Sequence, residues 1–411
     1  MFCTNCGNAL KNGARFCHVC GKPVYVPAET PAVAAPAAET PAVAAPDPRT
    51  LEMKRAYSRA GLSTVALYGT MSVGQSLAIV LIMVLAVAGS LLSRVELPAF
   101  GRNFVQDVME WVYGRLLTPL SITVLLLGAA AGTGLGIVLM RKIVKRGTPI
   151  EKRSLPFGRF VLIALMCFGV WGAGALLGNL AELFGATQDT LFSVERLGKG
   201  MLPYLIYAMI GAPILEELAF RKVLLDRLHE TGEGYAAVIS ALLFGLMHGN
   251  HAQFFLAFFL GLIFAMVYQR TGRIVYTMLL HAMINTTASI AALFAIFGID
   301  ISLGWNIAVG ALVLGGLVAL LLARKDPLLH TAACTIPDAN RVVYKNVGMR
   351  IARIAGLVLI GLQSVVFIFI PLLQSGNPAY LIGLIPLALA ILTVLLLPKF
   401  TWRYEGKEET I

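Results

Sequence analysis

The sequence predicts an all-α polytopic membrane protein of about ten transmembrane helices, with a small N-terminal zinc ribbon. Apolar residues make up 58% of the 411-residue chain and charged residues 13%, whereas a soluble domain has about one half apolar and one quarter charged residues. Several apolar runs also reach the roughly 20 residues that are needed to cross a bilayer. Four closely spaced cysteines near the N-terminus predict the ribbon.

The cysteines of the first 24 residues follow the spacing C-x2-C-x10-C-x2-C. A tetrahedral Zn²⁺ site takes four thiolates, and each Cys-x-x-Cys turn supplies two of them from one tight loop. So short a segment cannot build a hydrophobic core, and its folding energy has to come from the metal. A redox dithiol is the alternative, but the sequence around the cysteines lacks a βαβ pattern. We therefore predict a structural zinc ribbon at residues 1–24, similar to short ribbons fused to prokaryotic membrane proteins, with the ligands Cys3, Cys6, Cys17 and Cys20.

A proline-rich segment follows at residues 25–56. The unit AETPAVAAP occurs twice in it, at residues 28–36 and 38–46. Recurring proline favours an extended, semi-rigid chain. We interpret this segment as a linker that lets the ribbon reach away from the membrane.

Ten apolar segments follow the linker, and the charges between them predict the topology. The segments run near residues 70–92, 118–140, 160–183, 201–220, 235–249, 252–269, 275–297, 304–323, 354–373 and 379–398. The fifth is short, and we expect it to pair with the sixth as a hairpin inside the bundle. Lys and Arg concentrate in the connections after the second, fourth, sixth and eighth segments. The connection at 298–303, by contrast, has Asp300 as its single charged residue. The positive-inside rule therefore predicts that both termini are cytosolic, in a cell membrane that we expect to be prokaryotic.

The net charge of +11 raises the question of nucleic-acid binding. The basic residues lie in short runs between apolar segments and do not form one groove or stripe. This distribution favours anionic lipid headgroups as partners and excludes nucleic acid as the expected ligand.

Ionisable residues inside three of the apolar segments are the candidates for chemistry, because burying them in a membrane is costly. They are Glu216, Glu217 and Arg221 in the fourth segment, His248 in the fifth, and His281 with Asn285 in the seventh. Residues four apart share a helix face, so Glu217 is expected to pair with Arg221, and His281 to lie beside Asn285. Glu216 is rotated by about 100° from Glu217 and is left to face the histidines. His251 is expected to be a water-facing loop residue.

These residue types together suit hydrolysis of a peptide bond. A carboxylate such as that of Glu216 can accept a proton from water, and a histidine can bind the same water. Asn and a further His can donate hydrogen bonds to the tetrahedral oxyanion, and a low dielectric strengthens those bonds.

The same residues resemble the motifs of a known family. Glu-Glu-x-x-x-Arg at 216–221, Phe-x-x-x-His at 244–248 and His-x-x-x-Asn at 281–285 are similar to the three motifs of the CAAX protease and bacteriocin-processing family, also called Abi-type intramembrane proteases. The resemblance covers roughly residues 200–297. It implies that Glu216 and His248 activate water and that His281 and Asn285 form the oxyanion hole. Glu217 and Arg221 would shape this site, and its substrate would be a membrane protein or peptide.

The predicted organisation is then a zinc ribbon (1–24), a linker (25–56), an N-terminal transmembrane region (57–200), a protease core (201–297) and a C-terminal transmembrane region (298–411). The ribbon is expected to bind a cytosolic protein.

Other interpretations of the membrane site stay open from the sequence. Glu217 with Arg221 alone is more typical of a structural ion pair, and His281 with Asn285 alone is typical of interhelical hydrogen bonding. Glu216, His248 and His281 could ligate Zn²⁺, although the His-Glu-x-x-His pattern is absent and a metal-free mechanism is favoured. A non-proteolytic scaffold or bacteriocin-immunity protein of the same fold is the alternative function. A transporter is less favoured because the apolar segments show no clear internal repeat.

Overall fold

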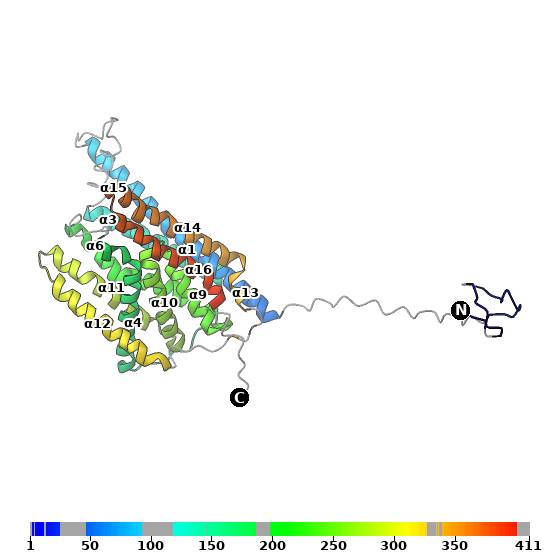
Figure 1. Ribbon diagram of the computed structural model, residues 1–411. Helices are drawn as coiled ribbons and strands as arrows, with labels where there is room; N and C mark the ends of the chain where they lie inside the picture. The colour runs from blue at the N-terminus through cyan, green and yellow to red at the C-terminus, as the bar shows by residue number, and fades with distance from the viewer. Residues whose placement is uncertain are drawn as a thin grey trace. The chain divides into compact units, whose positions relative to one another are not determined.

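The computed structural model divides the chain into two compact units, Met1–Pro46 and Asp47–Ile411, which are described separately (Figure 1). The described residues are 2–24 without Thr4, Asn12 and Gly13; 47–92; 118–185 without Arg146; 198–326; Cys334; Ile336; and 339–400. Most of the predicted linker, residues 25–46, lies outside the described residues, as does Arg146 in the basic connection after the second apolar segment.

The N-terminal unit is built from two loops with the same hydrogen bonds. In the first, the backbone N–H of Cys3 donates to Asn8 at 2.8 Å, and Gly7 donates back to Cys3 at 2.9 Å. In the second, Cys17 and Gly21 make the equivalent bonds, Cys17 to Lys22 and Gly21 to Cys17, both at 2.9 Å. Gly7 and Gly21 both have φ of +69°, a left-handed conformation that glycine adopts without strain. Each loop therefore brings two thiols to one side of a tight turn.

The membrane unit is an all-α bundle, and the predicted fold class is confirmed. Its main helices are α1 (Pro48–Leu92), α3 (Pro119–Val144), α4 (Phe157–Gly178), α9 (Glu233–Met247), α10 (His251–Thr271), α11 (Ile274–Ile296), α12 (Ser302–Leu322), α14 (Val347–Ser364) and α16 (Leu384–Phe400). A composite helix between α4 and α9 spans Met201–Thr231. Within the described residues, nine helical stretches are long and apolar enough to cross a membrane, and α9 is a shorter apolar helix. Each of the ten predicted segments thus corresponds to a helix, and the chain is an integral membrane protein.

The linker prediction is wrong at its C-terminal boundary. Helix α1 begins at Pro48, so residues 48–56 of the predicted linker are helical. Proline is tolerated in the first turn of a helix, and the Asp47 carboxylate accepts a hydrogen bond from the backbone N–H of Arg49 at 2.9 Å. Met53 and Tyr57 are then fully buried against the rest of the unit, which stabilises the extra turns.

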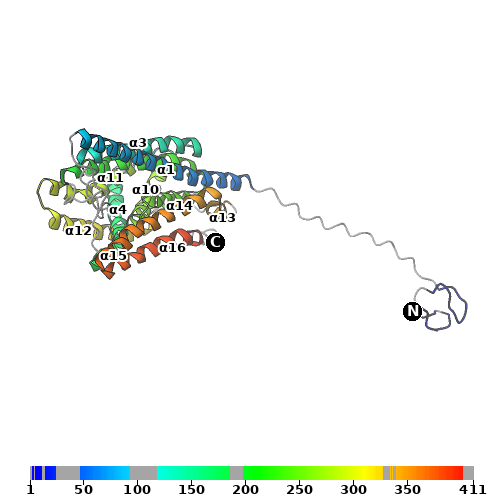
Figure 2. The same cartoon turned by 90° about the horizontal axis from the view of Figure 1, so that it is seen from above.

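Glycines set how closely the helices approach. A Cβ on Gly74 of α1 would collide with the backbone of Gly128 in α3, and Figure 2 shows these two helices running side by side. The same holds for Gly348 of α14 against Ser58 of α1. Small residues at helix interfaces are typical of membrane bundles, where close backbone packing replaces the hydrophobic effect as the driving force for association.

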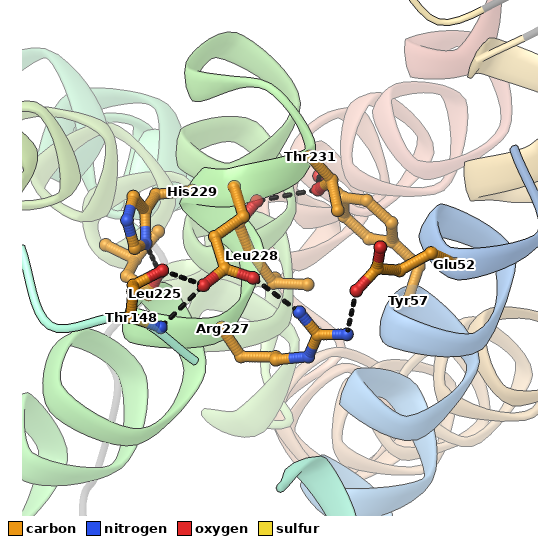
Figure 3. A network of polar contacts seen from close by, with 9 residues as sticks. Glu52, Tyr57, Thr148, Leu225, Arg227, Leu228, His229 and Thr231 are labelled. Carbon is orange, nitrogen blue, oxygen red and sulfur yellow. Dashed lines mark hydrogen bonds and ion pairs between the residues drawn. The ribbon is translucent and has the colours of Figure 1, made fainter. Parts of the chain in front are cut away.

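A network of polar contacts fixes the C-terminal end of the composite helix (Figure 3). Arg227 lies between two carboxylates, bonding Glu230 at 2.6 Å and Glu52 of α1 at 3.0 Å. Glu230 also accepts hydrogen bonds from the backbone N–H, at 2.5 Å, and from the hydroxyl of Thr148, in the segment between α3 and α4. The network therefore joins three parts of the chain that are distant in sequence.

Candidate active site

Two π-helical segments flank the glutamate pair in the composite helix. The segment η3 spans Tyr207–Gly211, the α-helical turn α7 spans Ala212–Glu217, and the second π segment η4 spans Leu218–Leu225. A regular helix of 3.6 residues per turn is the expectation from the sequence for this segment. Because a π turn contains an extra residue, it rotates the residues that follow it relative to a regular helix, and π-bulges occur often at functional sites.

The ion pair of Glu217 and Arg221 lies at the centre of the bundle. Both side chains are fully buried, with Arg221 Nε 3.2 Å from Glu217 Oε2. The guanidinium carbon lies 4.6 Å from the ring centroid of Phe244 and 5.4 Å from that of Phe264. Among the described residues, Arg221 Nη1 has no hydrogen-bond acceptor. The cation is therefore held by the carboxylate charge and by two aromatic faces, rather than by a full set of hydrogen bonds.

His281 of α11 connects the two glutamates. Its Nδ1 is 3.1 Å from Glu217 Oε1, and its Nε2 is 3.8 Å from Glu216 Oε2. A carboxylate oxygen that lies this close requires a donor, so we assign the Nδ1 hydrogen to the bond with Glu217. Nε2 then faces Glu216. The contact between His281 and Glu217 was missed from the sequence, because helical spacing relates only residues of the same helix.

His248 is the C-cap residue of α9, and a hydrogen bond to that helix fixes its ring. Its Nδ1 donates to the backbone carbonyl of Phe244 at 2.9 Å, which leaves Nε2 free as an acceptor in the neutral ring. The Phe244 ring lies 5.0 Å from the His248 ring and 5.9 Å from the His281 ring, edge to face in both cases. The Phe244 ring thus contacts both histidines. The structure shows no direct hydrogen bond or ion pair between His248 and Glu216, both of which are described.

Asn285 lies one turn beyond His281 on α11. Its Nδ2 donates to the backbone carbonyl of Ala208, in the π segment η3, at 2.8 Å. The site therefore brings together side chains from the composite helix, α9 and α11, and the predicted candidates gather there through Glu217, His281 and Phe244.

The expectation for His251 is wrong. Its side chain is buried at the start of α10, and Nδ1 lies 3.2 Å from the hydroxyl oxygen of Ser364. Ser364 donates its own hydrogen to the carbonyl of Ile360 at 2.7 Å, so the hydroxyl oxygen accepts from His251. Apolar residues on either side of the α9–α10 turn pack into the bundle and bury this histidine with them. Its hydrogen bond to α14 compensates the cost of removing the ring nitrogen from water.

The four N-terminal cysteines form a cluster whose geometry suits a tetrahedral metal. Their sulfur atoms all lie within 4.8 Å of one another, with Cys3 and Cys20 at 3.7 Å and Cys6 and Cys17 at 3.6 Å. Four sulfurs at about 2.3 Å from one zinc lie about 3.8 Å apart, so the cluster fits such an ion. Among the described residues this is the one group of three or more potential ligands close enough to share a metal.

Comparison with known proteins finds similarities in the part of the chain that contains the site. Residues 198–287, which include all three motifs, match the family described as type II CAAX prenyl endopeptidase Rce1-like. The chain is also 38% identical over 125 residues to a protein of Bacillus subtilis (strain 168) named "Putative membrane peptidase YdiL". That alignment covers 30% of this chain and 50% of the relative, so the chain spans about half the length of the curated relative it matches.

No solved structure shows a significant match to the chain. The resemblance found in the three motifs is nevertheless confirmed: from residue 198 to residue 287, the chain is similar to the Rce1-like CAAX prenyl endopeptidase family.

Proposed function

We propose that the membrane unit is an intramembrane endopeptidase of the CAAX protease type that hydrolyses a peptide bond with a water molecule. One observation carries the proposal. Glu217 is fully buried and paired with Arg221, whereas Glu216 is 19% exposed and, among the described residues, pairs with no Arg or Lys. Two adjacent carboxylates thus differ in environment, and only Glu216 is free to accept a proton from a bound reactant.

In the proposed reaction Glu216 and His248 activate the water. The Glu216 carboxylate accepts one hydrogen of the water, and the free Nε2 of His248 accepts the other. As the water oxygen bonds to the peptide carbon, Glu216 takes the first proton and the carbonyl oxygen becomes an oxyanion.

His281 and Asn285 stabilise the oxyanion in this proposal. In this proposal His281 donates from Nδ1 to Glu217 and from Nε2 to the oxyanion, with Glu217 and Glu216 on either side of its ring. Attacking oxygen and oxyanion share one carbon, so the 3.8 Å between Glu216 Oε2 and His281 Nε2 suits the base and the donor of such a pair. When the C–N bond breaks, Glu216 gives its proton to the leaving amine and returns to a carboxylate. The substrate would be a membrane protein or peptide.

Glu216→Gln keeps the size of the side chain but removes its ability to accept a proton. We expect cleavage to fall on the order of 10²- to 10⁴-fold, with protein level and thermal stability unchanged. The products are to be identified by proteomics of membrane-protein fragments in cells that express wild type or variant, and the rate then measured on a peptide that spans the cleavage site.

Glu233→Gln is the matched control, because Glu233 bonds Arg270 at the end of α10, outside the proposed site. It should cleave at the wild-type rate. If stable Glu216→Gln and His248→Ala proteins keep full activity, the peptidase proposal is wrong and a non-proteolytic scaffold takes its place.

We further propose that both termini are cytosolic, in a prokaryotic cell membrane. Contacts between the basic connections support this orientation. The backbone N–H of Arg153 donates to the carbonyl of Thr271, the last residue of α10, at 2.8 Å, and Arg159 bonds Asp326 after α12 at 3.2 Å. Thr148 contacts Glu230 at the end of the composite helix. The connections that carry most Lys and Arg therefore lie at one end of the bundle, the end that the positive-inside rule assigns to the cytosol.

Cysteines introduced at Ile150 and Asp300 test the orientation. An impermeant thiol reagent added to intact cells should label Asp300→Cys and should not label Ile150→Cys until the cells are permeabilised. The parent chain reports labelling of its own cysteines. The reverse pattern would contradict the proposed orientation.

The N-terminal cluster is proposed to hold a structural zinc ion that folds the ribbon, whose partner would be a cytosolic protein. Purified protein should contain about one zinc per chain, and Cys3→Ser or Cys17→Ser should remove it while leaving the melting of the membrane unit unchanged. Metal content by mass spectrometry and thermal melting of the same sample provide the two readouts. A second zinc that survives these substitutions would instead indicate a metal at Glu216, His248 and His281.

A further inference from the structure

The backbone carbonyl of Ala208 has lost its helical partner. In an α-helix it would accept from the N–H of residue 212, and in a π-helix from that of residue 213. The N–H of Ala212 bonds instead to Tyr207, five residues earlier. Residue 213 is a proline and has no N–H to give. The π turn and the proline together leave this carbonyl for a donor from outside the helix.

Asn285 supplies that donor. Its Nδ2 lies 2.8 Å from the Ala208 oxygen, which holds α11 against the composite helix. A carbonyl oxygen only accepts hydrogen bonds, so the amide must turn its nitrogen, and not its oxygen, toward Ala208. Among the described residues, Nδ2 has no second acceptor. One of its two hydrogens is therefore committed to Ala208, and the other is available to a reactant.

We infer that Pro213 is a positioning residue for Asn285. By withholding an N–H at this point in the helix, it keeps the Ala208 carbonyl available to orient the Asn285 amide, whose second N–H then faces the oxyanion. Pro213 does not touch the substrate in this arrangement; it acts through Ala208 and Asn285. The catalytic part of the inference rests on the proposed peptidase function, whereas the contact itself does not.

Pro213→Ala tests the inference in the full-length protein. It restores an N–H that can bond to Ala208 and displace Asn285, and alanine is a better helix former than proline, so the variant should fold. We expect kcat to fall about 10- to 100-fold with KM unchanged, because displacing a catalytic group from its productive position slows the chemical step by about that factor. The kcat of Asn285→Ala should be about 10²- to 10³-fold lower than that of wild type. The kcat of the double variant should be no lower than that of Asn285→Ala alone.

Pro203→Ala is the matched control, since Pro203 lies in the first turn of α6 (Met201–Ile206), where backbone N–H groups lack helical partners anyway. It should keep the wild-type kcat. A Pro213→Ala protein with wild-type kcat, or a double variant whose losses multiply, would overturn the inference.

Thermal melting of wild type, Pro213→Ala, Asn285→Ala and the double variant separates this inference from the proposed function. If wild type shows no peptidase activity, the proposed function is wrong, but a non-additive change in melting temperature between Pro213→Ala and Asn285→Ala still supports the contact. Additive changes would overturn it.

Discussion

Glu217 and Arg221 are both fully buried inside the membrane unit, where a single unpaired charge would cost several kcal/mol. The other side chains of the site are positioned by their contacts with this ion pair. The guanidinium packs against the rings of Phe244 and Phe264, and the Phe244 ring also contacts the rings of both histidines. The second oxygen of Glu217 binds His281 and fixes which ring nitrogen is free. Glu216, the neighbouring residue, faces His281 and pairs with no Arg or Lys among the described residues.

Irregular helix geometry also positions groups of the site, in addition to the buried charges. The two π segments on either side of Glu216 and Glu217 change the faces on which the following residues lie, and the first of them, with Pro213, exposes a backbone carbonyl. Asn285 uses this carbonyl to fix its amide. The composite helix thus contributes side chains and main chain to the site, while the contacts of Arg227 with Glu52 and Glu230 hold its far end.

The sequence predicts the membrane helices well, because crossing a bilayer demands long apolar runs that few other structures need. It also predicts the pairing of Glu217 with Arg221, since four residues on one helix place them together. The contact of His281 with Glu217 joins residues 64 apart in sequence, and no local pattern encodes it. The π segments were missed because their hydrogen bonds depend on packing, although Gly211 and Pro213 in an apolar run were a usable signal. The start of α1 at Pro48 could not be predicted from the sequence, because the proline-rich repeat directly before it favours an extended chain and makes the capping role of Asp47 hard to recognise.

Glu217 and Arg221 balance each other's charge, which leaves Glu216 as the carboxylate that pairs with no Arg or Lys among the described residues. A double-mutant cycle in thermal or denaturant unfolding tests it most directly, with Glu217→Gln, Arg221→Met and both together. Gln still accepts the hydrogen bond from His281, and Met fills the space between the two rings. Each single variant should lose about 3–5 kcal/mol, because one buried charge is left unpaired, and the double variant should recover most of that loss. A double variant as unstable as the sum of the two single variants would contradict the account.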